Sequence, residues 1–438
     1  MLGVEIVLAR FRLSLTPLLV ALSRTMPRRG ALLYALLVFL AGASLIREAS
    51  VGRLAPVDER WSDILARRAS PKSATAPVTL VEISDETLIK HAWPWGPDDF
   101  ALFFHAALPF QPAVLALGEI LDFERDLLAE RDPVFEKMLR DHVLRSPKLV
   151  LAGRLGWAPD SDTAPDLRPM PVLRKDKVRG DLRQVPEFSD VSAWAAEDYR
   201  LTTQPGWTNL PDTAGPRARC PLVLRYRGQP VPSIVLQLAM HLEKVTLDEV
   251  EVVLGSHIAI GKSRTVPIDE AGRMLVNPGA GYGRIAFDDL LLSREQIDRK
   301  ETPVQPVDFF KGRVILLSRS DTEARLLTAP DGQKIAPGEF FAASLATLEA
   351  NAFPQRIGTW FDWSLVGFAA INALWLRKWK PLFSVSAVAL ILAGYAGIAF
   401  LIFNSRFLIL PIALPAGLAV WVLLLRLVAR RIERVIAF

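Results

Sequence analysis

The chain has 438 residues, 51% of them hydrophobic, and its mean hydropathy of +0.25 is high for a soluble protein of this length. Its formal net charge of +5 is modest and gives no indication of a nucleic-acid partner. The single cysteine, Cys220, excludes an internal disulfide and a cysteine-based metal site, and we expect it to be a small core residue beside Pro221.

The N-terminal part predicts a basic segment followed by one membrane helix. Residues 1–30 contain five arginines and are predicted to form a basic amphipathic helix on the cytoplasmic membrane face. The apolar run that follows ends at Arg47, which predicts a transmembrane helix over 31–47 that acts as a signal anchor. The small residues of Ala41-Gly42-Ala43 leave a cleaved signal peptide as the alternative. The domain that follows is exported in both cases.

Four short apolar runs in the central part of the chain predict buried parallel strands. Runs of this length, bounded by turn residues, are typical of strands that are covered on both faces of a sheet. They are VTLVEI at 78–83, AVLALG at 113–118, KLVLAG at 148–153 and RVILLS at 313–318.

Helix signals alternate with these runs. Asp98-Asp99 begins a predicted helix to about Phe110, and Asp132-Pro133 provides the N-cap and first-turn proline of another, to about Arg145. Two more helices are predicted, one after Pro232-Ser233 and one from Pro337. The alternation predicts an α/β fold with three layers and a largely parallel sheet. Two segments depart from it: 156–199 is predicted to be an irregular insertion, and 250–267 alternates like a β-hairpin.

Three apolar stretches near the C-terminus predict a bundle of membrane helices. They are Trp360–Leu376, Pro381–Phe403 and Phe407–Leu425, and Pro411 and Pro415 are expected to bend the last one. Basic residues lie before the first helix, in Arg377–Lys380 and after Leu425, which predicts that both termini are in the cytoplasm. The predicted organisation is a cytoplasmic segment 1–30, a transmembrane helix 31–47, an extracytoplasmic domain 48–356, a transmembrane bundle 357–428 and a cytoplasmic tail 429–438.

An ordered series of motifs connects the chain to a known family. The series contains VTLVEISDETL from Val78, Trp93-Pro94-Trp95, Gly206-Trp-Thr-Asn209, Pro211 to Arg217, Pro267 to Arg273, Lys311-Gly312-Arg313 and Pro337-Gly338. Over residues 55–428 this series, with the helices around it, resembles the type 2 CHASE domain, an extracellular sensory module of bacterial membrane receptors. The resemblance implies a sensory function.

The chain departs from the family's pattern at three places. Glu119 stands where the family commonly has aspartate, Ser318 stands for the usual glycine, and Phe341 to Ser344 replace frequent His and Asn residues. Family members commonly continue into a cyclase or kinase domain, whereas this chain ends at Phe438. The resemblance therefore implies the sensory half of a receptor, working with a separate cytoplasmic output protein.

Other motifs are expected to be structural. The stretch Gly255–Ser263 ends like a phosphate-binding loop, but it has five residues between its glycines and lies in the predicted hairpin. The histidines show no metal-ligand spacing, so no metal and no cofactor is expected. Trp93-Pro94-Trp95 is expected to anchor packing, and Asn209, like the turn at Asp269, is expected to have a local structural role.

One set of charged residues is the candidate ligand site. In open α/β sheets, ligands bind beyond the carboxyl ends of the parallel strands. The charged residues that follow the four predicted strands are Asp85, Glu119, Asp122, Arg154, Arg319 and Asp321. Such a set would bind a polar or zwitterionic small molecule, and the alternative is that these charges form salt bridges or are solvated.

The sequence thus predicts a membrane sensor or signalling adaptor and not an enzyme. Its expected partners are membrane lipid, a small molecule or periplasmic protein outside, and a cytoplasmic signalling protein that binds the Arg377–Lys380 loop or the Arg430–Phe438 tail. The resemblance also suggests a homodimer. Two alternatives stay open: a structural or assembly protein without a small ligand, and a membrane-tethered enzyme, although no nucleophile–base set is visible.

Overall fold

The computed structural model divides the chain into two units. The helical unit comprises Met1–Leu65 and Gln355–Phe438, and the sheet domain comprises Ala66–Pro354. The structure describes residues 27–68, 75–123, 133–157, 170–200, 202–210, 219–277, 279–324, 326–328, 334–376 and 381–436. Most of the predicted cytoplasmic segment, the Arg377–Lys380 loop, the 211–217 motif and the end of the tail lie outside the described residues.

Within the described residues, seven strands form the main sheet of the sheet domain. In sheet order they are β15 (Gly283–Ala286), β1 (Val78–Ile83), β16 (Val314–Arg319), β2 (Val114–Leu117), β3 (Leu149–Gly156) and β6 (Asp190–Ala193), with β7 (Gln204–Trp207) also paired to β3. Every pair is parallel except β3–β6. The four predicted strands are β1, β2, β3 and β16, so the prediction of a largely parallel sheet is confirmed.

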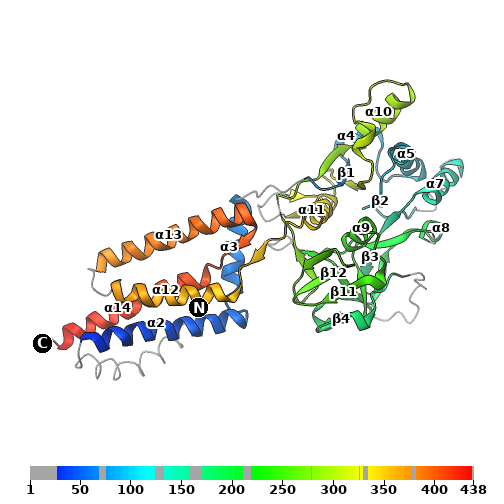
Figure 1. Ribbon diagram of the computed structural model, residues 1–438. Helices are drawn as coiled ribbons and strands as arrows, with labels where there is room; N and C mark the ends of the chain where they lie inside the picture. Colours follow the sequence, from blue (N-terminus) through cyan, green and yellow to red (C-terminus); the bar gives the residue numbers. More distant parts are fainter. Residues whose placement is uncertain are drawn as a thin grey trace. The chain divides into compact units, whose positions relative to one another are not determined.

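Helices cover both faces of this sheet (Figure 1). On one face lie α5 (Pro97–Ala107), α7 (Pro133–Arg145) and α10 (Phe287–Asp298), and on the other lie α9 (Ile234–Glu243) and α11 (Pro337–Glu349). Successive residues of each strand enter opposite cores: Leu80 packs with α9 and α11, and Val81 packs with α5 and α10. Continuous apolar runs are required because both faces are covered.

The four predicted helices are all present. Asp99 Oδ2 accepts a hydrogen bond from Gly96 N (3.0 Å) at the start of α5, and Ser233 Oγ accepts one from Leu236 N (3.4 Å) at the start of α9. Proline occupies the first position of α5, α7 and α11, where its missing N–H leaves no hydrogen bond unmade. Two short α-helices, α4 (Asp85–Lys90) and α8 (Glu197–Arg200), also belong to this domain.

Smaller sheets extend the domain. The segment predicted to be a hairpin is a meander of β11 (Val250–Val253), β12 (His257–Ile260) and β13 (Arg264–Pro267), with β4 (Val178–Arg179) at its edge. Gly255 and Gly261 have φ of +77° and +61° in its turns, so Gly255–Ser263 does not have the strand-to-helix geometry of a phosphate-binding loop. The other pairs are β5 (Glu187–Phe188) with β9 (Val223–Tyr226), β9 with β10 (Gln229–Pro232), β8 (Arg219–Pro221) with β14 (Arg273–Leu275), and β17 (Leu327–Thr328) with β18 (Lys334–Ile335).

The segment 156–199 is less irregular than the sequence predicts. Within its described residues, β4, β5 and β6 are short strands that pair with β11, β9 and β3, respectively. Each partner is distant in sequence, and such non-local pairing leaves no periodic signal in runs of two to four residues.

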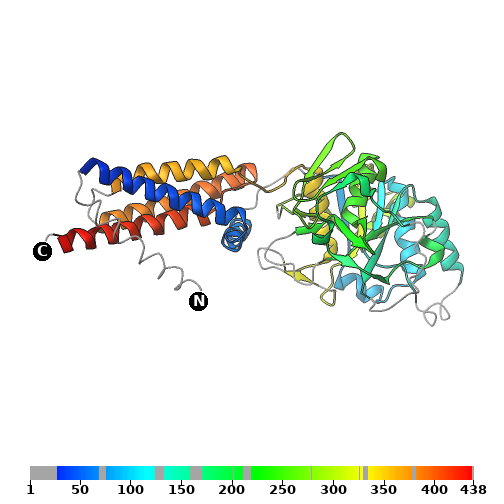
Figure 2. The ribbon, with the colours of Figure 1, turned by 90° about the horizontal axis from the view of Figure 1, so that it is seen from below.

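The helical unit is a bundle of long helices. They are α2 (Pro27–Ser50), α12 (Thr359–Leu376), α13 (Pro381–Arg406) and α14 (Ala413–Ile436), and both views show them side by side (Figures 1 and 2). Their buried faces share a core that includes Val38, Val366, Leu418 and Val422. An amphipathic helix that the sequence analysis missed, α3 (Ala55–Arg68), follows α2.

The prediction of one N-terminal and three C-terminal membrane helices is shown only in part. Among the described helices, two are long and apolar enough to cross a membrane, at Leu33–Ser50 and Phe383–Arg406. Asp362 and Asn372 lower the hydropathy of α12. The last predicted span begins too early, because Pro411 lies ahead of α14 and the apolar part of that helix covers only Ala413–Val428.

Candidate functional site

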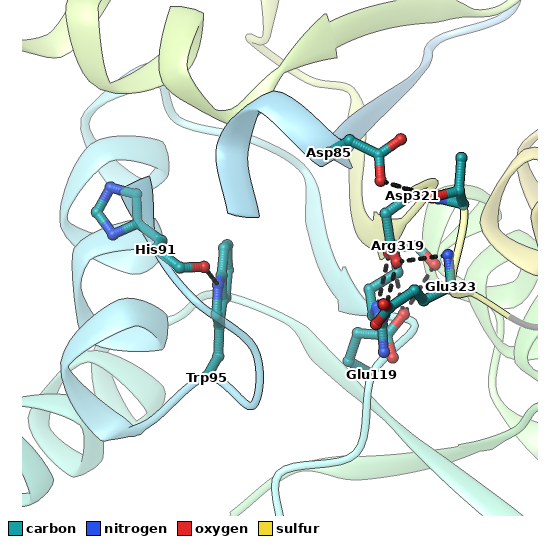
Figure 3. A network of polar contacts seen from close by, with 9 residues as sticks. Asp85, His91, Trp95, Glu119, Arg319, Asp321 and Glu323 are labelled. Carbon is teal, nitrogen blue, oxygen red and sulfur yellow. Dashed lines mark hydrogen bonds and ion pairs between the residues drawn. The ribbon is translucent and has the colours of Figure 1, made fainter. Parts of the chain in front are cut away.

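Four of the six predicted site residues meet at the carboxyl edge of the main sheet (Figure 3). Asp85 follows β1, Glu119 follows β2, and Arg319 and Asp321 lie at the end of β16. Since β1, β16 and β2 are parallel neighbours, their carboxyl ends share one edge. We call these four residues, with Ser318 and Thr322, the carboxyl-edge network.

An ion pair forms the centre of the network. Arg319 Nε and Nη2 donate to the two carboxylate oxygens of Asp321 at 2.7 and 2.6 Å, a bidentate geometry. The Asp321 side chain is 0% exposed and that of Arg319 is 16% exposed. Burial acts to raise the pKa of Asp321, but the hydrogen bonds and charge of Arg319 outweigh it, so the pKa lies below its ordinary value. Asp321 is therefore ionised and neutralised from within the protein.

Glu119 and Ser318, two residues at which the chain departs from the family's pattern, contact each other in this network. Glu119 Oε1 accepts hydrogen bonds from Ser318 Oγ (3.1 Å) and from Arg319 N (3.0 Å). Ser318 is 3% exposed, and a Cβ added to Gly338 would lie 2.3 Å from its Cβ. The serine fits because α11 has glycine at this position, and the longer side chain of Glu119 accepts a hydrogen bond from the serine hydroxyl.

Asp85 joins the network from β1. Its Oδ1 accepts hydrogen bonds from Thr322 N (3.1 Å) and Thr322 Oγ1 (3.0 Å), so the segment after β16 is tied to the neighbouring strand. The network contains three carboxylates and one guanidinium, which leaves the edge with negative charge. An edge of this kind favours a ligand that presents a cation or hydrogen-bond donors.

The other two predicted site residues do not belong to the network. Asp122 is exposed in the segment after β2, and Arg154 is exposed on β3, where its carbonyl accepts from Ser192 Oγ (3.1 Å). Neither side chain has a hydrogen bond or ion pair within the residues that the structure describes.

The aromatic motif beside the network anchors packing. Trp95 is 2% exposed, contacts Phe287 at 4.7 Å between ring centroids, and donates from Nε1 to the carbonyl of His91 (3.0 Å; Figure 3). The ring of Trp93, which precedes a cis proline, lies 4.5 Å from the Arg319 guanidinium carbon. The predicted packing role is confirmed for Trp95, and the face of Trp93 is occupied by Arg319.

Other motif residues are also structural. The Asn209 side chain accepts from Leu155 N and donates to Leu155 O, both at 2.8 Å, in the manner of a strand partner. Asp269 accepts from the N–H groups of Ala271 and Arg273 in the turn before β14. Cys220 is buried, as predicted, and burial raises its pKa to about 12.

A second polar region, in the helical unit, was missed by the sequence analysis. It is the α13–α14 connection, residues 407–412. The short strand β20 (Leu408–Ile409) lies within this connection and pairs in parallel with β19 (Gln355–Arg356). Gln355 N also donates to Phe407 O (2.9 Å). Thus the chain that leaves the sheet domain pairs directly with this connection.

The chain that enters the sheet domain contacts the same connection through α3. Trp61 Nε1 donates to Leu410 O (3.1 Å), and Asp58 Oδ1 accepts from Ile412 N (2.9 Å) and Ala413 N (2.8 Å). The carboxylate therefore caps α14, where it is favoured by the helix dipole. Arg356 Nη2 lies 3.8 Å from Asp58 Oδ2, so this ion pair links the chain that enters the sheet domain to the chain that leaves it. The sequence feature that could have indicated these contacts is the acidic residue Asp58 in the first turn of α3.

No group of three or more His, Cys, Asp or Glu residues that could hold a metal occurs among the described residues. The fold is an α/β domain with a mainly parallel sheet, and the two candidate membrane helices indicate a membrane protein. A family model described as the CHASE2 domain matches residues 33–389, and the chain therefore belongs to the CHASE2 domain family of extracellular sensory domains. Neither a curated protein nor a solved structure matches the chain.

Proposed function

We propose that the protein is a sensor or signalling adaptor of a bacterial inner membrane. Its sheet domain lies outside the cytoplasm, α2, α12, α13 and α14 span the membrane, and both termini are cytoplasmic. Family membership supports the sensory role. The basic residues on one side of each apolar helix support this orientation, because lysine and arginine are retained on the cytoplasmic side.

One observation carries the proposal of a relay: both covalent links to the sheet domain are bound to the α13–α14 connection. Asp58 and Trp61 bind it on the entering side, and β19 binds it on the leaving side. A ligand that prefers one arrangement of the sheet domain would shift the position of either link. The shift would reach α14 through its capped N-terminus and move the cytoplasmic end of that helix.

The signal would pass to a separate cytoplasmic protein. The Arg377–Lys380 loop and the Arg430–Phe438 tail are the proposed contacts, since both are basic and the connection links the helix that follows the loop, α13, to the helix that leads into the tail, α14. A homodimer is the proposed working unit. The protein would act by binding and not by catalysis.

The ligand is proposed to be a polar small molecule or a periplasmic protein at the carboxyl edge. Asp122 and Arg154 are the proposed direct contacts, because Asp85, Glu119, Arg319 and Asp321 already bond to one another or to neighbouring residues. A ligand there would change the network by competing with Arg319 or Thr322 for the carboxylates.

A spin-label experiment tests the relay. Cys220 is buried, so cysteines introduced as Leu36→Cys in α2 and Val428→Cys in α14 would be labelled selectively in the full-length protein. A metabolite library is first screened for compounds that stabilise the protein; a ligand at about 100 times its dissociation constant adds roughly 2.7 kcal/mol. We expect such a compound to change the distance between the two labels.

The matched variant is Trp61→Phe, which removes the hydrogen bond to Leu410 O and keeps an aromatic ring. We expect it to retain ligand stabilisation and to reduce the change in distance between the labels. A ligand that stabilises the protein without changing that distance in the unmodified chain contradicts the relay.

A second candidate function is an assembly factor without a small ligand. The internal pairing of the carboxyl-edge network favours it, since four of the six charged residues need no ligand to satisfy them. Absence of stabilisation by every compound in the library, together with a stoichiometric periplasmic partner, would support this candidate over the sensor.

A further inference from the structure

A pocket opens at the opposite, amino-terminal edge of the main sheet. Its volume is about 560 Å³, within the range of roughly 300–1,000 Å³ that small-molecule sites occupy. It is bounded by the ends of α5 and α7 and by the residues that lead into β2 and β3, among them Gln111 and Pro147. It shares no residue with the carboxyl-edge network.

Two histidines from different helices face each other in this pocket. The ring centroids of His105 in α5 and His142 in α7 are 6.1 Å apart. His142 Nδ1 is buried and has no hydrogen-bond partner within the described chain. Since that nitrogen has almost no accessible surface, it is the rest of the His142 ring that lines the pocket.

The charge around the pocket favours an anion. Arg145 lines the pocket, is exposed, and forms no ion pair within the part of the chain that the structure describes. Burial lowers the pKa of His142, and the nearby His105 and Arg145 lower it further, whereas Asp141 opposes them. Arg145 therefore provides a positive charge at the pocket that no carboxylate of the described chain pairs with.

The remaining wall is apolar and stiff. Leu108, Pro109, Pro112 and Pro147 contribute it, and three of these four have the fixed φ of proline. A wall that does not rearrange suits a preformed site, and an apolar wall beside an arginine suits a ligand with a hydrophobic body and one anionic group. A bare metal ion or inorganic anion would leave most of the pocket's volume unfilled.

We propose that this pocket binds a small organic carboxylate, with the carboxylate held by Arg145 and His142 and the hydrophobic body against the prolines. Arginine binds a carboxylate through two parallel hydrogen bonds, and the His142 ring at the same pocket adds positive charge when it is protonated. The site stands independently of the relay proposed above, because binding here requires no conformational change.

Equilibrium dialysis of the full-length protein in lipid nanodiscs tests this site, with empty nanodiscs as the blank. Radiolabelled benzoate is the probe, benzyl alcohol presents the same body without charge, and inorganic phosphate presents charge without the body. We expect saturable binding of benzoate to one site per chain and weaker binding of the other two. Arg145→Gln should weaken benzoate binding by about tenfold, the usual effect of losing a charge-assisted pair.

The control is Lys137→Gln, which removes the same charge from an exposed position of the same helix, outside the pocket. We expect it to leave the affinity unchanged. Lowering the pH from about 7 to about 5 should strengthen binding, since protonation of His142 adds a positive charge beside the ligand while Arg145 stays charged. His142→Gln should remove most of that pH dependence.

Three outcomes would overturn the proposal. They are no saturable benzoate binding, equal loss of affinity in Arg145→Gln and Lys137→Gln, and binding of Zn²⁺ that strengthens with rising pH in a protein that does not bind benzoate. The last would identify the histidine pair as a metal site, because metal binding needs neutral imidazoles.

Discussion

At the scale of single residues, the carboxyl-edge network stabilises the segment after β16. Ser320 N donates to the carbonyl of Ile83 (2.9 Å), Thr322 binds Asp85, and Asp321 Oδ2 accepts from Glu323 N (3.1 Å). The buried ion pair of Asp321 with Arg319 lies at the centre of these contacts. Removing one partner of such a pair leaves the other charge uncompensated.

We therefore expect Asp321→Asn to lower the free energy of unfolding by about 3 kcal/mol. The amide keeps the shape of the side chain but cannot neutralise Arg319. The matched control is Asp122→Asn, an exposed aspartate at the same edge, which should change stability by less than about 0.5 kcal/mol. Denaturant unfolding of the full-length protein measures both. Equal effects would show that the network does not stabilise the domain.

A partly buried histidine should make stability depend on pH. Burial, and to a lesser extent the charge of Lys148, lower the pKa of His241 from 6.5 to about 4. Below pH 6.5 the unfolded chain takes up a proton that the folded chain does not, so stability is full above pH 6.5 and falls as the pH approaches 4.

The expected loss at the acid end is about 2 kcal/mol, reduced from the full shift because the ring is partly solvated. His241→Gln cannot take up this proton and should show a smaller decrease in stability between pH 7 and pH 4.5 in thermal unfolding. Identical pH profiles of the two proteins would assign the acid sensitivity to other groups.

At the scale of elements, the sequence was most informative where a pattern was local. The strands at 78–83 and 313–318 are visible as uninterrupted apolar runs, and the helix from Pro337 has a first-turn proline. The α13–α14 connection could not be predicted, because its contacts join Asp58 to Ala413 and Gln355 to Leu408, far apart in sequence. The same limit applies to the pairing of Glu119 with Ser318.

The close packing of α2 against α12 predicts that a larger residue at Gly42 destabilises the bundle. A Cβ on Gly42 would lie 2.6 Å from both methyl carbons of Val366, whereas one on Gly394 in α13 would meet nothing within 4 Å. Gly42→Ala should therefore destabilise the bundle by about 1–3 kcal/mol through overpacking. Gly394→Ala should be neutral or stabilising by up to about 1 kcal/mol, since alanine favours helix. Thermal unfolding in detergent distinguishes them, and a neutral Gly42→Ala would contradict the packing of these two helices.

At the scale of the whole molecule, both ends of the sheet domain are attached to one bundle of apolar helices. Because a lipid bilayer accepts only helices whose backbone polar groups are paired within the protein, α2 and α13 are the firmest candidates to cross it. The proposed α12 and α14 spans complete an even number of crossings. The proposed topology would put the carboxyl-edge network and the amino-edge pocket outside the cytoplasm.

Alkaline phosphatase fusions test this topology most directly, since the enzyme is active only after export. Fusions after Gly156 and after Asn404 should be active, and fusions after Lys378 and after Ile436 should be inactive. Activity after Lys378 would eliminate α12 as a span. Inactivity after Gly156, with the fusion protein intact, would place the sheet domain in the cytoplasm and contradict the proposed sensor.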